Sequence, residues 1–212
     1  MTKTKLLALF AIIGVISSIS AYSAYAVGGY TETTQKAGQI VASGKWFTAF
    51  DVGTIQAATA KSNTLVAYPI ELANDTNISA LGMAYTASSP TTTCRTGVYS
   101  DDGNGNPGTL IIDSGNFTKA RYFQSNSVST TLSAGIYHLA MNCNGANGIY
   151  GFNDASGQVY GQSFTNNVAP DSQYGGVTAS QTFGDGSNAL PSTFPSVSGH
   201  SQIVPFIALQ RQ

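Results

Sequence analysis

From residue 45 onward, hydrophobic and polar residues alternate in short runs. One face of residues 63–72 is apolar at every second position: Val66, Tyr68, Ile70 and Leu72. Such alternation is typical of a β-strand that buries one face. Further runs, bounded by turn-forming residues, occur at 45–50, 78–86, 94–100, 109–112, 128–132, 135–143, 149–153 and 202–210. No helical stripe stands out after the first 26 residues, so the pattern predicts an all-β domain, an antiparallel sandwich or barrel.

Two regions depart from this pattern. Residues 27–44 are polar and rich in Gly and Thr, which indicates a linker or leading strand before a β-sandwich domain at 45–212. Residues 144–199 are rich in Gly, Ser and Asn, yet a structureless loop of that length is exceptional, so two or three further short strands are expected there. Pro69 and Pro205 lie inside predicted strands and indicate edge strands, because proline has no N–H for a central ladder.

The first 26 residues have the order of a secretory signal. Two lysines precede an apolar run at 6–16, and small and polar residues follow as far as an A-x-A pattern at Ala24 and Ala26. We therefore predict a signal peptide at 1–26, with cleavage after Ala26. The apolar run is shorter than the ~20 residues that cross a bilayer, although a retained anchor is the alternative if residues 17–26 extend it. A secreted or cell-surface protein without an integral membrane anchor is expected.

Charge is sparse in this chain. It has nine Lys and Arg and ten Asp and Glu, and the signal segment takes two of the lysines, so seven bases face ten acids in the mature chain. Because no basic cluster could neutralise a row of phosphates, nucleic acid is excluded as a partner.

The two cysteines, Cys94 and Cys143, each stand on the apolar side of a predicted strand. In an oxidising compartment an even count predicts a disulfide, and we expect it to bridge the two layers of the sandwich. Two buried free thiols are the alternative. No histidines flank the cysteines, so a zinc site is not indicated.

Four segments carry a resemblance to a known module. Residues 95–115 read RTGVYSDDGNGNPGTLIIDSG and residues 132–139 read LSAGIYHL; ALPSTFP at 189–195 and PFIAL at 205–209 complete the set. Together they resemble a jelly-roll β-sandwich module of phage tail and virion proteins and of secreted prokaryotic surface proteins. The resemblance implies a jelly-roll fold with a binding or assembly role, and it carries no active site, because the shared residues are turn and core residues. The cysteines are not part of the shared pattern.

Residues 101–106 combine oxygen-bearing side chains with glycines. Asp101, Asp102, Asn104 and Asn106 offer the carboxylate and amide oxygens that Ca²⁺ prefers. However, no Glu follows at EF-hand spacing, and Asp, Asn and Gly are also the residues that a tight turn requires. The turn is the favoured interpretation and a calcium loop the alternative; no other cofactor is expected.

Aromatic residues suggest where a ligand could bind. Tyr150, Tyr160 and Tyr174 lie among amides and hydroxyls and are candidates for stacking against a sugar, unless they only hold long loops onto the sandwich. Trp46, the single tryptophan, alternates with Thr48 and Phe50, and core packing is its favoured interpretation.

Catalytic and modification signals are weak. His138 and His200 are the only histidines, and no G-x-S-x-G elbow accompanies them, so an enzyme is not predicted. Three N-x-[ST] sequons are candidates for glycosylation, although chance explains them in a chain so rich in Asn and Thr: Asn74, Asn77 and Asn116.

The sequence thus predicts a secreted or cell-surface, non-catalytic recognition or adhesion module with a surface glycan, or a surface protein, as its partner. The alternative is a self-assembling structural subunit of a surface layer, filament or virion, in which Val27–Gly44 adds a strand to a neighbouring sheet. A secreted hydrolase ranks third.

Overall fold

The computed structural model describes residues 42–49, 55–86, 93–117, 121–146, 148–153, 176–180, 189–201 and 203–212. All regular secondary structure in these residues is β-structure. The strands are β1 (Trp46–Phe47), β2 (Ile55–Thr59), β3 (Thr64–Leu72), β4 (Thr76–Tyr85), β5 (Cys94–Asp101), β6 (Pro107–Phe117), β7 (Tyr122–Leu132), β8 (Gly135–Cys143), β9 (Gly148–Asn153), β10 (Gly176–Ser180), β11 (Gly199–Ser201), β12 (Ile203–Pro205) and β13 (Ile207–Arg211). None of the residues described forms a helix that could span a lipid bilayer.

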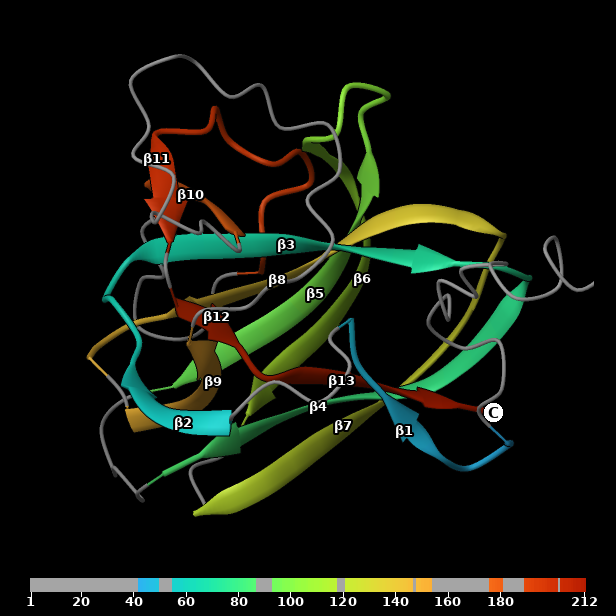
Figure 1. Ribbon diagram of the computed structural model, residues 1–212, viewed down its shortest axis with the longest axis horizontal. Helices are drawn as coiled ribbons and strands as arrows, with labels where there is room; N and C mark the ends of the chain where they lie inside the picture. The colour runs from blue at the N-terminus through green and yellow to red at the C-terminus, as the bar shows by residue number, and fades with distance from the viewer. Residues whose placement is uncertain are drawn as a thin grey trace, which may run out of the picture. The chain divides into compact units, whose positions relative to one another are not determined.

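The strands form two antiparallel sheets. Sheet A has the order β11-β10-β3-β8-β5-β6, and sheet B has the order β1-β13-β4-β9-β12, with β2 paired to β9 and β7 paired to β4. In Figure 1 sheet A occupies mainly the upper part of the ribbon and sheet B the lower part. The main hydrophobic core draws buried side chains from both sheets. The predicted all-β, sandwich-like architecture is therefore confirmed.

The longer strands bury the faces that their alternation predicts. In β3, Tyr68, Ile70 and Leu72 belong to the main core, and β4 contributes its own alternating set, Leu81, Met83 and Tyr85. Removing a large apolar side chain from water stabilises the fold by about 1.5–3 kcal/mol, so these strands hold the two sheets together. β10 lies within 144–199, where two or three further short strands were expected, and β11 begins at the end of that region, whereas β2 was not predicted.

The first strand has the opposite orientation to the prediction. β1 pairs with β13 so that Phe47 lies opposite Leu209 and Trp46 opposite Gln210. Phe47 and Leu209 are both in the main core. Because neighbouring residues of a strand point to opposite faces, Trp46 lies on the outer face of sheet B, where it is half-buried. The core interpretation of Trp46 is wrong.

The two strand prolines have different settings. Pro205 lies in β12, at an edge of sheet B, as predicted. The prediction for Pro69 is wrong for its strand as a whole, because β3 lies between β10 and β8. Pro69 is tolerated there because β10 pairs only with Thr64–Ala67, so that only β8, among the described strands, pairs with β3 at the proline.

The predicted disulfide joins Cys94 to Cys143, but it does not bridge the two layers. The cysteines lie directly opposite each other on β5 and β8 of sheet A, with their Cα atoms 4.1 Å apart. Both side chains are fully buried on the core side. A cross-link over a sequence separation of 49 residues stabilises a fold by about 4 kcal/mol in the chain-entropy model. A disulfide also indicates an oxidising environment outside the cytoplasm.

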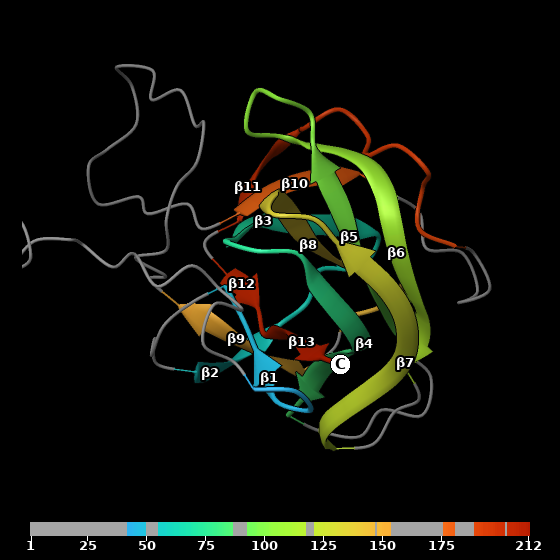
Figure 2. The ribbon, with the colours of Figure 1, turned by 90° about the vertical axis from the view of Figure 1, so that its right-hand side faces the viewer.

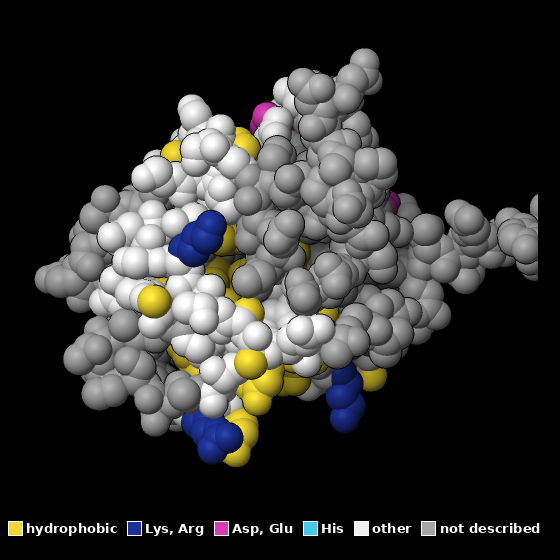
Figure 3. All heavy atoms as spheres, turned by 60° about the vertical axis from the view of Figure 1, so that its left-hand side comes forward, with side chains coloured by type: hydrophobic (Ala, Val, Ile, Leu, Met, Phe, Trp, Pro, Cys, Tyr) yellow, Lys and Arg dark blue, Asp and Glu magenta, His cyan; other side chains and the backbone are white. Residues whose placement is uncertain are grey.

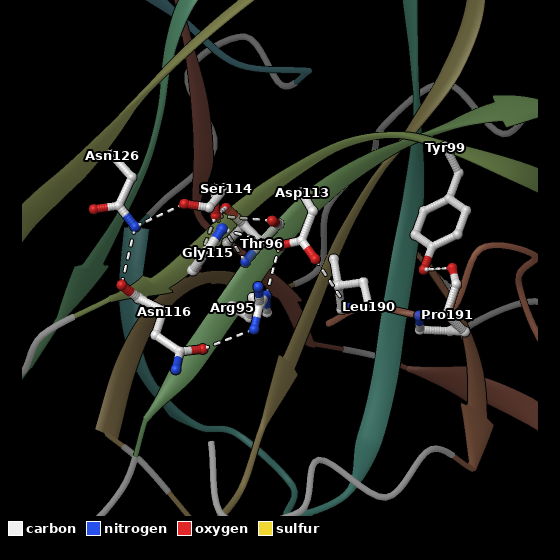
Figure 4. A network of polar contacts seen from close by, with 10 residues as sticks. All are labelled: Arg95, Thr96, Tyr99, Asp113, Ser114, Gly115, Asn116, Asn126, Leu190 and Pro191. Atoms are coloured by element: carbon white, nitrogen blue, oxygen red, sulfur yellow. Dashed lines mark hydrogen bonds and ion pairs between the residues drawn. The ribbon is translucent and has the colours of Figure 1, made fainter. Parts of the chain in front are cut away.

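A second, smaller core covers the outer face of sheet A. The segment 189–198, here called the strap, places Leu190 and Phe194 against Tyr99 and neighbouring small and apolar side chains of the sheet. The Tyr99 hydroxyl donates to the carbonyl of Pro191 (2.9 Å), and the Leu190 N–H donates to Asp113 (3.0 Å). Figure 4 shows these contacts.

The strap also covers part of one sheet edge. The Leu110 N–H donates to the carbonyl of Ser192 and the Phe194 N–H donates to that of Gly108, at 2.9 and 2.8 Å. These bonds occupy part of the free edge of β6. The backbone groups of an edge strand otherwise offer a template for another chain.

One side chain connects the edges of the two sheets. The Asn126 amide of β7 donates to the main-chain carbonyls of Ser114 (2.9 Å) and Asn116 (3.0 Å) on β6. β6 and β7 belong to different sheets and lie side by side in Figure 2. Asn126 therefore holds one side of the sandwich closed.

Candidate recognition surface

Three aromatic rings from separate parts of the chain meet at sheet B. They are Trp46 of β1, Phe123 of β7 and Phe206, which connects β12 to β13; we call them the aromatic patch. The ring centroids of Trp46 and Phe123 are 4.8 Å apart and nearly perpendicular, at 81°. Those of Phe123 and Phe206 are 6.3 Å apart at 71°. Edge-to-face pairs of this kind are favourable, so the three rings support one another.

Small residues beneath the rings make this arrangement fit. Phe123 lies opposite Ala84, and the neighbouring Gly82 lies opposite Ala208 of β13. The Phe123 ring lies so close to the backbone at Gly82 that a Cβ atom added there would meet Phe123 Cζ at 2.2 Å. The sheet is therefore shaped to receive the ring, which nevertheless stays 39% exposed.

The surface around the rings is polar as well as aromatic. Phe123, Ser125 and Ser127 share one face of β7, since they stand at alternate positions, and both serines are exposed. In Figure 3 hydrophobic side chains gather in the lower part of the face shown, between two basic side chains. The combination of ring and hydroxyl is suited to a polar ligand with an apolar side.

Tyr122 begins β7 in a strained conformation. Its φ of 78° lies in the left-handed region, which is rare for an aromatic residue and costs of the order of 1–3 kcal/mol. Its ring is 60% exposed, and the guanidinium of Arg121 lies over it, 4.9 Å from the centroid. Strain of this kind often marks a binding site.

Only one of the three predicted tyrosines lies in the described residues. Tyr150 is in β9, half-buried, opposite Ala57 of β2, and its carbonyl accepts a hydrogen bond from the Phe206 N–H at 2.9 Å. Tyr160 and Tyr174 lie outside the described residues. The structure thus brings Tyr150 close to the patch through Phe206 and tests neither of the others.

The loop at residues 101–106 is a hairpin connection between β5 and β6. Asp101 Oδ1 accepts hydrogen bonds from the N–H groups of Gly103 (2.7 Å) and Gly105 (3.3 Å). Asp102 Oδ1 accepts from those of Asn104 (2.8 Å) and Asn106 (3.1 Å).

Turn geometry accounts for the residue types of this loop. Both glycines have positive φ, at 87° and 83°. The hydrogen bond from the Asn104 N–H is the main cause that lowers the pKa of Asp102. In the part of the chain that the structure describes, no three His, Cys, Asp or Glu side chains are placed to hold a metal ion. The calcium alternative has no further support.

His138 lies beside this loop, on the outer face of sheet A. Its side chain is 2% exposed, and Nε2 donates to Asp101 Oδ2 at 2.9 Å. Burial is the main cause that lowers the pKa of His138, and Asp101 opposes it. Nδ1 is buried without a hydrogen-bond partner among the described residues. The side chain of His200 is not among those described.

The three sequon asparagines are all exposed. Asn74 lies in the turn between β3 and β4. Asn77 Oδ1 accepts a hydrogen bond from the Thr131 hydroxyl at 2.7 Å, and Asn116 Oδ1 accepts one from Arg95 at 3.2 Å. Their side chains are therefore accessible, and two of them already have local partners.

Comparison with known proteins identifies no relative: no family model, no curated protein and no solved structure matches the chain. Sequence reasoning missed the aromatic patch, although Phe123 followed by serines at alternate positions signals one aromatic on a solvated strand face.

Proposed function

We propose that this chain is an extracytoplasmic, non-catalytic recognition module that binds a surface glycan on the aromatic patch of sheet B. The observation that carries the proposal is the meeting of Trp46, Phe123 and Phe206 over small residues at an accessible surface. The proposal includes export with cleavage after Ala26 and a sandwich of the jelly-roll type.

Sugar rings suit such a surface because one side presents C–H groups and the rim presents hydroxyls. A C–H face stacks on an exposed aromatic ring such as Phe123, and the hydroxyls of Ser125 and Ser127 hydrogen-bond the sugar rim directly or through water. A favourable contact between a sugar and an aromatic ring contributes about 1 kcal/mol to the binding free energy. A ligand held by two such contacts and a few hydrogen bonds binds with a Kd on the order of 0.1–1 mM.

The experiment is a binding panel of polysaccharides and cell-wall fractions, measured by affinity electrophoresis with the mature protein. Trp46→Ala and Phe123→Ala should each weaken retention, raising Kd about fivefold. Ile111→Ala is the matched control, because Ile111 is an equally exposed apolar residue (40%) on β6 of sheet A. No retention of the wild-type protein on any polysaccharide, or equal loss with the Ile111 variant, contradicts the proposal.

Trp46 offers a second readout. It is the single tryptophan of the chain and lies in the patch itself, so its fluorescence should change in titrations with any glycan that the panel identifies. The assembly alternative rests on residues 27–44, of which 27–41 lie outside the described residues.

A further inference from the structure

Charge is divided unevenly between the two sheets. The strands of sheet B contain no Asp or Glu. The acidic residues that the structure describes lie in the strands of sheet A or in turns: Glu71, Asp75, Asp101, Asp102 and Asp113. Of these five, Asp75 is nearest to sheet B along the chain, but it precedes Gly82 by seven residues, which is about 20 Å along a strand. That distance exceeds the Debye length of about 8 Å at physiological salt.

Basic residues stand next to the aromatic patch. Lys45 directly precedes Trp46 and is exposed, and Arg121 is two residues before Phe123 and is also exposed. Within the described part of the chain, neither side chain is paired with a carboxylate. The patch is thus flanked by positive charge, although the chain as a whole is slightly acidic.

We infer that the ligand of the aromatic patch is an acidic polysaccharide, whose carboxylates or other anionic groups bind Lys45 and Arg121 while its sugar rings stack on Trp46 and Phe123. This inference rests on the proposed function and specifies its ligand class. A chain with one acid group per sugar or per disaccharide presents charge and C–H faces in alternation, which matches a patch of rings with bases at its sides.

The conformation of Tyr122 supports this arrangement. Its left-handed backbone, φ 78°, places an exposed ring under the Arg121 guanidinium. The ring limits the freedom of the Arg121 side chain, so less conformational entropy is lost when an anion binds. An exposed arginine without such a neighbour would be less well organised for binding.

An anionic membrane is the competing partner for aromatic and basic residues. The neighbours of Phe123 on the same face of β7 are Ser125 and Ser127, both exposed. Burying these hydroxyls at the boundary of the acyl chains would leave them without partners. Hydrated sugar hydroxyls, in contrast, can bond to them. The surface therefore favours the polysaccharide.

The test compares two forms of one polymer, polygalacturonate and its fully methyl-esterified derivative, which have the same backbone but differ in charge. The acidic form should bind about tenfold more tightly, and its binding should weaken as salt rises from 50 to 500 mM. Lys45→Gln and Arg121→Gln should each weaken binding about threefold. Lys61→Gln is the matched control, an exposed lysine between β2 and β3, and should change nothing.

The outcomes separate the two proposals. If both polymers bind equally tightly, or only neutral glycans of the panel bind, and Trp46→Ala weakens that binding, the charge inference is wrong and the proposed function stands. If no glycan of either charge binds, the proposed function fails. Binding to vesicles containing phosphatidylglycerol, without binding to polygalacturonate, would overturn the inference in favour of a lipid surface.

Discussion

Gly82→Ala tests whether the aromatic patch is held as the geometry implies. The substitution adds one methyl group beneath the Phe123 ring, where the new Cβ would lie 2.2 Å from Cζ and 2.7 Å from Cε2. These atoms belong to the far end of a side chain, so the ring can move away from the sheet. The fold should survive, while the contact between Phe123 and Trp46 should not.

The change in the free energy of unfolding caused by Gly82→Ala follows from two opposing effects. Overpacking at such a site costs about 1–3 kcal/mol, and replacing a strand glycine with alanine returns about 0.5–1 kcal/mol through the unfolded chain. We expect a net loss of about 1 kcal/mol, which lowers Tm by about 2–4 °C in a domain of this size. In a Phe123→Ala background both of these ring contacts disappear, while the contact of the new Cβ with the Gln124 carbonyl, at 3.0 Å, remains.

The assay is a double-mutant cycle by urea unfolding with Gly82→Ala, Phe123→Ala and the double variant. A coupling energy of about 1–3 kcal/mol is expected, because the second substitution removes the clash. The fluorescence of Trp46, whose ring contacts Phe123, reports the ring displacement directly in the folded state. If Gly82→Ala costs the same with and without Phe123, and Trp46 emission does not change, the arrangement described for the patch is wrong.

Three further results are expected. Replacing Cys94 and Cys143 together with alanine should lower the free energy of unfolding by about 4 kcal/mol in urea melts, and a smaller loss than 1 kcal/mol would contradict the cross-link. His138 has a folded-state pKa below its ordinary value of 6.5. The free energy of unfolding should therefore be highest above pH 6.5, and it should decrease by at most about 1.4 kcal/mol for each pH unit below 6.5. His138→Gln should remove that slope, and an unchanged slope refutes the assignment. Asn126→Ala should lower the free energy of unfolding by about 2 kcal/mol, and Asn126→Asp should lower it further, because a carboxylate would face two carbonyls. Thermal melts that show no loss of stability would contradict the role of Asn126 in joining the edges of the two sheets.

The parts of the fold that follow from local chemistry could be predicted from the sequence. The alternation in β3 and β4 is long enough to fix which face is buried, and the hairpin after β5 follows from residues that favour Asx turns and positive φ. β1 was oriented wrongly because a strand of two residues has no periodicity of its own. Its orientation is set by pairing with β13, which lies more than 150 residues later in the chain.

The candidate site could not be predicted for the same reason. Trp46, Phe123 and Phe206 have no common spacing in the sequence, and only the pairing of β1, β13, β4 and β7 brings their rings together. The disulfide partners followed from the number of cysteines, but their place within one sheet depended on the register of β5 and β8. Long-range register is the information that a pattern along one chain lacks.

The disulfide within sheet A also has a mechanical consequence. Force applied through the segments before Cys94 and after Cys143 would pass through the sulfur atoms and bypass the strands between them. The bond spans a sequence separation of 49 residues, a stretch that would otherwise lengthen by about 160 Å when fully pulled out. A chain pulled from these two segments would therefore extend by a much shorter distance, and β5 to β8 would keep their fold under load.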